Sequence, residues 1–230
     1  MRHKFQFLLC IAFCLLATSC NHSSINDLPT DDCPYSDFFG CCHGFETGDL
    51  IFVADTSGMG SAIYQSTGAY THVAVVVCED SGCYIYEAIP SAGVIRTQYD
   101  EWAEQILSLL PDTNMSFLDI AHLMQFVCDY DTALLVQRLH ENLGKPYDPY
   151  FLPNNDRFYC SELVYESFYD KSGKRLFEAK PMNFKSSDGT YPAYWVHHFD
   201  SLGVAIPQGI SGTNPTNLHN STCLMPLKIE

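Results

Sequence analysis

The sequence contains few positively charged residues. Twelve Lys and Arg side chains stand against 27 Asp and Glu side chains, which gives the 230-residue chain a formal net charge of -15 at pH 7. A surface of this sign repels nucleic acids and anionic lipid headgroups. We therefore expect neither of them among the partners of this protein, although charge alone says little about its fold.

The chain also lacks an apolar run long enough to span a membrane. Its N-terminal stretch FQFLLCIAFCLL follows the positively charged Arg2 and Lys4 and is too short for a transmembrane helix, so it predicts a secretory signal. The small residues directly before Cys20 resemble a bacterial lipobox, in which the cysteine carries the lipid and becomes the new N-terminus.

We therefore expect residues 1–19 to be a lipoprotein signal peptide. Residues 20–46 would form a lipidated N-terminus, a polar tether and a cysteine-rich segment, and residues 47–230 are enough for one domain. This organisation predicts a protein of the bacterial cell envelope, attached to a membrane only through its lipid anchor. A plain secretion signal with a nearby cleavage site is the alternative interpretation.

Metal-ligating residues at the spacing of a zinc site are absent. Such sites separate their ligands by about two to four residues and need a second pair, and the adjacent residues of CCH at 41–43 meet neither requirement. We expect no metal and no cofactor. In an oxidising compartment several cysteines beyond the signal can instead form disulfides. These cysteines are Cys20, Cys33, Cys41, Cys42, Cys78, Cys83, Cys128, Cys160 and Cys223.

Internal repeats and low-complexity segments are missing too, and the remaining pattern favours an α+β fold. Runs rich in β-branched and aromatic residues predict strands at 48–55, 71–77, 84–89, 93–99 and 117–123. Apolar spacing predicts helices at 61–67, 101–107, 131–144 and 159–173. Asp131 is the expected N-cap of the third helix, and long irregular loops are expected from Tyr191 onward. Strands that precede the main helices indicate an antiparallel sheet or barrel packed on helices.

Cys160 opens the helix predicted from the stretch RFYCSELVYESF at 157–168. Unpaired N–H groups and the positive dipole end at a helix N-terminus stabilise a thiolate. Leu163, Val164 and Phe168 can bury their side chains behind it. Cys160 is therefore a candidate nucleophile that still needs a base. A buried cysteine without chemistry is the ordinary alternative.

His72 is the candidate base, because a hairpin would bring it close to Glu87. If a turn centred on Asp80 and Ser81 joins the strands 71–77 and 84–89, Ala74 faces Glu87 and His72 lies two residues farther along the same face. His72 and Glu87 are then diagonal neighbours within reach of each other. An imidazole backed by a carboxylate is the arrangement that thiol catalysis uses.

The same register places Cys78 directly opposite Cys83. A cross-strand disulfide between them is therefore one expectation, although cross-strand geometry is often strained. Free thiols at both positions are the other. A bulge in either strand would move His72 or Glu87 to the opposite face of the hairpin and separate the pair.

Several of these segments together resemble the permuted NlpC/P60 family, in particular its YiiX-like branch. They are TGDLIFV (47–53), THVAVVV (71–77), YIYEAI (84–89), LGKPYDPYF (143–151) and FYCSELVYESF (158–168). The segment IPQGISGTNPTNL (206–218) resembles the C-terminal part of that branch. The resemblance covers almost the whole chain from Thr47 to Leu218.

This resemblance implies a papain-like thiol hydrolase in which the histidine strand precedes the cysteine helix. Cys160 then matches the nucleophile, His72 the base and Glu87 the orienting residue. Tyr159 and Tyr147 are expected to shape the site. The implied substrate is a cell-wall peptide, derived from peptidoglycan, or a related small amide.

Two other function classes stay open. A thioesterase or lipid acyltransferase would use the same three residues, and would have an apolar groove near Cys160. A peptide hydrolase would instead offer polar groups that hold free amino or carboxyl ends. A non-catalytic binding module is the third class, and a disulfide from Cys160 to Cys128 or Cys223 would support it.

Overall fold

The strands and helices are known from a computed structural model that describes residues 44–55, 58–108 and 121–227. All of these residues belong to one structural unit, Phe39–Glu230.

Several sequence predictions fall outside the described residues. They concern the signal peptide (1–19), Cys20, the tether up to residue 43 with its CCH segment, and residues 117–120 of a predicted strand. These expectations stay predictions.

The centre of the fold is an open, six-stranded antiparallel sheet with the strand order β4-β3-β2-β1-β5-β8. Its strands are β1 (Leu50–Val53), β2 (His72–Glu79), β3 (Gly82–Ile89), β4 (Gly93–Gln98), β5 (Ala121–Phe126) and β8 (Leu224–Pro226). Two short strands, β6 (Lys180–Pro181) and β7 (Ser211–Gly212), pair separately. The predicted α+β class is confirmed, and the described strands form a sheet that does not close into a barrel.

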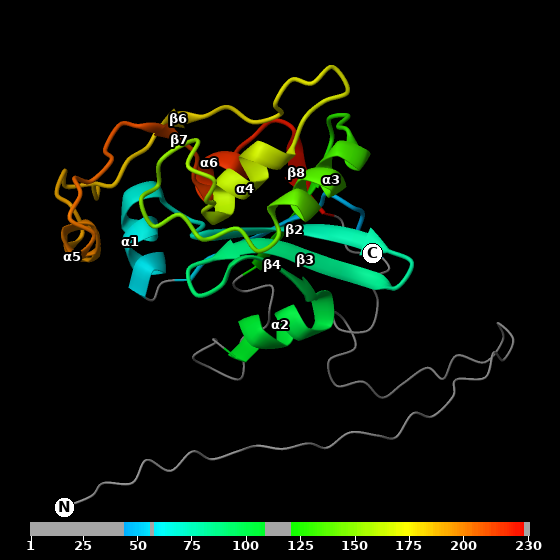
Figure 1. The fold of residues 1–230 in the computed structure, drawn as a ribbon, viewed down its shortest axis with the longest axis horizontal. Helices are drawn as coiled ribbons and strands as arrows, with labels where there is room; N and C mark the ends of the chain where they lie inside the picture. Colours follow the sequence, from blue (N-terminus) through cyan, green and yellow to red (C-terminus); the bar gives the residue numbers. More distant parts are fainter. Residues whose placement is uncertain (1–43, 56–57, 109–120, 228–230) are drawn as a thin grey trace, which may run out of the picture. The chain divides into compact units, whose positions relative to one another are not determined.

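Helices cover both faces of this sheet (Figure 1). The helices α3 (Thr132–Asn142), α4 (Cys160–Ser167) and α6 (Pro215–His219) lie on one face, and α2 (Tyr99–Ser108) packs under β3 and β4 on the other. The helices α1 (Gly58–Thr67) and α5 (Ala193–Ser201) pack together beside the sheet. None of the helices in the described part of the chain is long and apolar enough to cross a lipid bilayer.

The β2–β3 hairpin has the register expected from the sequence. Asp80 and Ser81 form the connecting turn, and Glu79 pairs with Gly82. Gly82 has a φ of 127°, which residues with a Cβ rarely adopt. Cys78 faces Cys83 in the same ladder, and the structure joins these two cysteines by a disulfide.

Helix α3 begins and ends near the residues expected from the sequence. Asp131 is its N-cap, and the carboxylate accepts a hydrogen bond from the backbone N–H of Leu134 at 3.0 Å. At the other end, Gly144 has a φ of 77° and the helix stops two residues earlier. Because the N-cap carboxylate satisfies a backbone donor that has no partner inside the helix, it fixes where the helix starts.

Helix α4 is shorter than predicted, because it ends at Ser167 instead of continuing to Gly173. Phe168 turns to extended backbone and is fully buried, with its ring stacked on Phe126 at 4.7 Å. Asp170 then accepts hydrogen bonds from the backbone of Ser172 and Lys174. Burial of Phe168 and the turn closed by Asp170 therefore outweigh the helical preference of the sequence.

The region after Tyr191 is also more regular than predicted. It contains α5, α6, β7 and β8, where long irregular loops were expected. Trp195 and Phe199 of α5 are buried in a second apolar cluster with Phe151, Tyr159 and other residues. The frequent Pro and Gly residues mark the ends of these short helices and strands and do not prevent their formation.

The N-cap of α3 is expected to contribute measurably to the stability of the protein. Replacing Asp131 by Ala removes the acceptor for Leu134 and should lower the free energy of unfolding by about 1 kcal/mol, whereas Asp131→Asn keeps an acceptor and should cost much less. Urea unfolding of both variants measures the difference. Equal losses in the two variants would contradict the capping role.

Candidate active site

Cys160 is the first residue of α4. Tyr159 before it has extended backbone (φ -92°, ψ 166°) and caps the helix without a side-chain hydrogen bond. Leu163 and Val164 are buried and hold the helix against the sheet. The Cys160 residue itself is 7 % exposed. The thiol is therefore held at the end of a rigid element, beside backbone N–H groups that have no partner within the helix.

Cys160 is the free cysteine of the described residues. Cys128 and Cys223 form a disulfide with each other. Neither is therefore available to Cys160, and the pairing that would have supported a non-catalytic binding module is not found.

His72 and Glu87 meet as the hairpin register predicts. The His72 Nε2 atom lies 2.6 Å from Glu87 Oε2, and the side chains are 21 % and 6 % exposed. Burial lowers the pKa of His72, but hydrogen bonds and charge interactions with Cys160 and Glu87 outweigh it and raise that pKa to about 10. Since Nε2 of His72 is bonded to Glu87, Nδ1 is the ring nitrogen available to the Cys160 thiol.

Glu162 supports the start of the cysteine helix. It stands in the first turn of α4, and its carboxyl accepts a hydrogen bond from the backbone of Tyr159. Its other oxygen, Oε2, is buried and has no hydrogen-bond partner among the described residues. Burial first, and then the charges of Asp148 and Glu166, raise the pKa of Glu162 from 4.5 to about 8. The capping acid is therefore largely uncharged at neutral pH.

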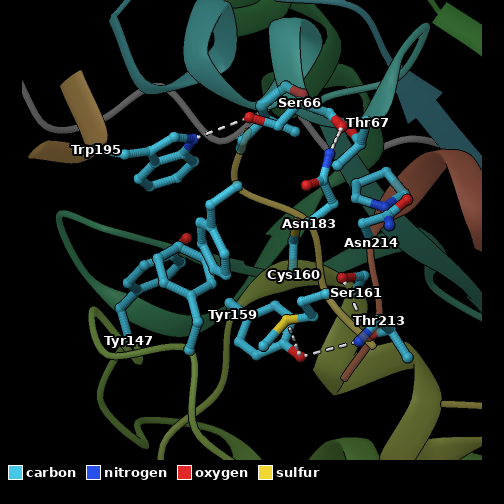
Figure 2. Close-up of a pocket in the computed structure, with 15 residues that line it drawn as sticks. Ser66, Thr67, Tyr147, Tyr159, Cys160, Ser161, Asn183, Trp195, Thr213 and Asn214 are labelled. Carbon is cyan, nitrogen blue, oxygen red and sulfur yellow. Dashed lines mark hydrogen bonds between the residues drawn. The ribbon is translucent and has the colours of Figure 1, made fainter. Parts of the chain in front are cut away.

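A pocket opens beside Cys160 (Figure 2). It encloses about 450 Å³, counting the part open to solvent. Its walls come from α1, the segment before α4, α4 itself, the segment after β6, α5, and the segment before α6 together with the first residue of that helix. The lining residues are Ile63, Ser66, Thr67, Tyr147, Phe151, Tyr159, Cys160, Ser161, Met182, Asn183, Phe184, Trp195, Thr213, Asn214 and Pro215.

Tyr159 and Tyr147, which the sequence suggested as site-shaping residues, both line this pocket. The Tyr159 hydroxyl accepts a hydrogen bond from the backbone N–H of Thr213 at 3.2 Å and donates to the sulfur of Met182 at 3.7 Å. The Tyr147 hydroxyl donates to the sulfur of Met59 at 3.6 Å. Both phenols are held in place by the protein.

Much of the pocket lining was not identified from the sequence. Phe184 and Trp195 follow Cys160 in the chain beyond β6, and no local pattern links them to it. Thr213, Asn214 and Pro215 belong to the segment 206–218, whose resemblance to the family was the one available signal.

Other histidines lie away from the His72–Glu87 pair. His122 Nδ1 contacts the Tyr70 hydroxyl at 2.8 Å and His219 Nε2 at 2.7 Å. In the part of the chain that the structure describes, no group of three or more His, Cys, Asp or Glu side chains is arranged to hold a metal ion.

Comparison with known proteins identifies the family. A family model described as permuted papain-like amidase enzyme, YaeF/YiiX, C92 family, matches residues 44–227. The chain belongs to this permuted papain-like amidase family. It is therefore a cysteine hydrolase of the amidase type, and its sheet and helices are a papain-like fold in permuted order.

Two relatives illustrate how far similarity to the permuted amidases extends. The uncharacterised protein YiiX of Escherichia coli K12 is 27% identical over 163 residues, which are 70% of this chain and 75% of that protein. A crystal structure described as the metalloprotein YiiX of Escherichia coli O157:H7 matches with a TM-score of 0.64 and 23% identity. The match covers 80% of this chain and 97% of the other, and at this identity it supports the fold alone.

Replacing Glu87 by Gln tests the geometry of the histidine pair. The amide keeps a hydrogen-bond acceptor but removes the negative charge, so the pKa of His72 should fall below its value of about 10. NMR titration of the His72 ring measures this change. Glu79→Gln, which alters an exposed carboxylate paired with Arg96 at the far end of β2, should leave the pKa of His72 unchanged. An unshifted pKa in Glu87→Gln would contradict the pairing.

Replacing Glu162 by Gln tests the buried acid. With a pKa of about 8 in the folded state against 4.5 for an ordinary glutamate, the stabilising contribution of the bound proton is complete below about pH 4.5 and is lost as the pH rises through 8. The variant should lose less free energy of unfolding over this window than the wild type. We expect a difference on the order of a few kcal/mol, at about 1.4 kcal/mol per pKa unit.

Chemical unfolding at several pH values measures this difference. The matched control is Glu104→Gln on α2, where the residue is exposed, and it should follow the wild-type profile. Parallel profiles for Glu162→Gln and the wild type would show that Glu162 has an ordinary pKa.

Proposed function

We propose that the enzyme hydrolyses an amide through Cys160 as nucleophile, His72 as general base and Glu87 as the residue that orients the imidazole. The observation that carries this proposal is a free cysteine at the start of a helix, in contact with a histidine whose other nitrogen is bonded to a buried carboxylate. This combination supplies a nucleophile, a proton acceptor and an orienting group.

The proposed reaction has two stages. His72 takes the proton of the Cys160 thiol, the sulfur attacks the carbonyl carbon, and the imidazolium returns that proton to the leaving amine as the carbon–nitrogen bond breaks. Water, deprotonated by His72, then attacks the thioester and releases the acid and the thiol. The raised pKa of His72 supports a ring that holds a proton while the sulfur is negatively charged.

Backbone N–H groups at the start of α4 are the proposed oxyanion donors. The N–H groups of a first helical turn lack partners inside the helix, and Glu162 already satisfies the backbone of Tyr159. The backbone N–H groups of Cys160 and Ser161, the first two residues of α4, are then available to the carbonyl oxygen of the substrate. Such donors stabilise the charge that develops during attack.

The proposed chemistry uses side chains and backbone only. The Escherichia coli O157:H7 relative is described as a metalloprotein. The described residues of this chain do not bring together three His, Cys, Asp or Glu ligands. They therefore do not fit such a metal, and the proposed reaction contains no metal-dependent step.

The location proposed from the sequence completes this hypothesis. A lipid on Cys20 would attach the catalytic domain to a membrane of the bacterial cell envelope, where a cell-wall peptide is one candidate substrate and a lipid-derived amide or ester is another. No nucleic acid is expected as a partner. The choice between these substrates depends on the pocket beside Cys160.

Alkylation of Cys160 tests the nucleophile without a known substrate. Iodoacetamide should label Cys160 rapidly at about pH 6, where an ordinary thiol with a pKa near 8.5 is almost fully protonated. His72→Ala should slow this labelling by about tenfold or more, because the proton acceptor is gone. Peptide mass spectrometry separates Cys160 from the other cysteines.

The control is His197→Ala, which removes an exposed histidine on α5 and should not change the rate. Labelling of Cys160 no faster than an ordinary thiol, in the wild type and in His72→Ala alike, would refute the proposed nucleophile.

A further inference from the structure

Glu162 is a buried carboxyl group for which the proposed reaction so far has no role. It is the third residue of α4, and it is 6 % exposed. Its carboxyl accepts a hydrogen bond from the backbone of Tyr159, but Oε2 is buried without a hydrogen-bond partner among the described residues. An ionised carboxylate would lose the hydration of this oxygen without compensation. The geometry therefore favours the protonated acid.

The side chain of Glu162 stays out of the pocket beside Cys160. Tyr159, Cys160 and Ser161 line that pocket, as Figure 2 shows, and Glu162 is not among its described lining residues. Glu162 therefore does not touch a substrate bound there. Any effect that it has on the reaction must pass through the backbone at the start of α4.

The side chains of Tyr159 and Ser161 are bonded away from the start of α4. Tyr159 occupies the N-cap position without a side-chain hydrogen bond to the helix, and its hydroxyl bonds instead to the backbone N–H of Thr213. The Ser161 hydroxyl bonds to the Thr213 hydroxyl at 3.2 Å. Glu162 takes the N–H of Tyr159, one residue before the helix. The N–H groups of Cys160 and Ser161 therefore stay available to the carbonyl oxygen of a substrate.

Two negative charges face Glu162. Asp148 in the segment before α4 is fully buried, and Glu166 lies one turn farther along α4. Their charges, after burial itself, raise the pKa of Glu162 to about 8. Asp148 is held in place because its two carboxylate oxygens accept backbone hydrogen bonds from Tyr150 and Leu152. A second buried negative charge beside it is therefore unfavourable.

The arginines and His72 on the segments around α4 are engaged elsewhere. Arg138 of α3 and Arg157 before α4 donate to backbone carbonyl groups. His72 of β2 bonds to Glu87 of β3. Glu162 therefore has no cation to pair with among the described residues. The other titratable groups on these segments are Lys145, Tyr147, Tyr150 and Asp156 before α4, Tyr165 of α4, Glu79 of β2, Tyr84 and Tyr86 of β3, His140 and Glu141 of α3, and His219 of α6.

The protonation state of Glu162 decides how much of the helix charge is left for the reaction. The N-terminus of a helix carries a partial positive charge, which a carboxylate in the first turn would compensate. The proposed oxyanion forms beside Cys160, at the same end of α4. A neutral acid satisfies the Tyr159 backbone without adding a negative charge there.

We propose that Glu162 is a positioning residue of the reaction, which caps α4 in its uncharged form and so leaves the first N–H groups of the helix to the oxyanion. This rests on the proposed function and adds to it a residue that acts through the backbone. When Glu162 ionises, its charge opposes the oxyanion and compensates the helix dipole. Acylation of Cys160 then slows, although the thiol and His72 are unchanged.

This role sets an alkaline limit to the reaction. With a pKa of about 8, Glu162 is mostly protonated at about pH 7 and mostly ionised at about pH 9. His72 keeps its proton over this range, because its pKa is about 10. A decrease in rate centred near the pKa of Glu162 therefore reports this acid and not His72.

Acylation by 4-nitrophenyl acetate tests the proposal with the full-length protein. The sulfur of Cys160 forms a bond to the acetyl carbon as the bond to 4-nitrophenolate breaks, and this leaving group departs without a proton. Single-turnover acylation, followed by the mass of the acetylated protein, should slow by roughly fivefold or more from about pH 7 to about pH 9. Alkylation by iodoacetamide, which forms no oxyanion, should not slow over the same range.

Three variants assign the effect. Glu162→Gln mimics the uncharged acid, because its amide keeps an acceptor for the Tyr159 backbone and does not ionise, so its acylation rate should match the wild type at about pH 7 and stay level up to about pH 9. Asp148→Asn removes a charge that raises the pKa of Glu162, so the decrease should move to lower pH. The matched control is Glu141→Gln, an exposed glutamate of α3, which should keep the wild-type profile.

Three outcomes would overturn the role of Glu162 while Cys160 is still rapidly alkylated. They are a wild-type acylation rate that stays level with pH, a decrease that persists in Glu162→Gln or does not move in Asp148→Asn, and no acetyl transfer to Cys160 at any pH. The Asp148→Asn profile decides even where Glu162→Gln does not fold. Slow alkylation of Cys160 at about pH 6 would instead refute the proposed function itself.

Discussion

The register of the β2–β3 hairpin is the constraint on which the site depends. It places the Glu87 carboxylate in the interior, where a charge is costly unless it is paired, and it brings His72 to within 2.6 Å as the partner. A slip by one residue would turn one of these side chains to the other face of the hairpin. The turn therefore fixes the relative position of His72 and Glu87, although it lies at the other end of the two strands, at residues 80–82.

The parts predicted correctly from the sequence are those set by local rules. Alternation and the two-residue turn determine the hairpin, and the carboxylate of Asp131 determines where α3 begins. The predicted end of α4 was wrong because the helix stops where Phe168 stacks on Phe126 of β5, a contact with a residue far away in the sequence. Helix α5 was missed for a similar reason, since its buried face packs against residues from α1 and the segment before α4.

The pocket could not have been derived from sequence patterns. Its lining comes from segments that run from Ile63 to Pro215, and each contributes one to three side chains without a motif of its own. What joins them is packing: a cluster that includes Phe151, Phe184 and Trp195 forms the aromatic wall, and its rings meet edge to face. The residues proposed for catalysis can therefore be found from local sequence patterns, whereas the lining of the pocket is set by tertiary structure.

The disulfide between Cys128 and Cys223 joins residues that are 95 positions apart. It closes a covalent ring that contains α3, α4 and the Cys160 thiol, whereas His72 lies outside it and is held against the ring by non-covalent contacts. In the chain-entropy account, a ring of this size stabilises the folded state by roughly 4 to 5 kcal/mol. The proposed mechanism therefore needs two states of sulfur in one chain: a free thiol at Cys160 and a disulfide between Cys128 and Cys223. A reductant that opens the bond between Cys128 and Cys223 would remove this covalent link and leave the Cys160 thiol as it is.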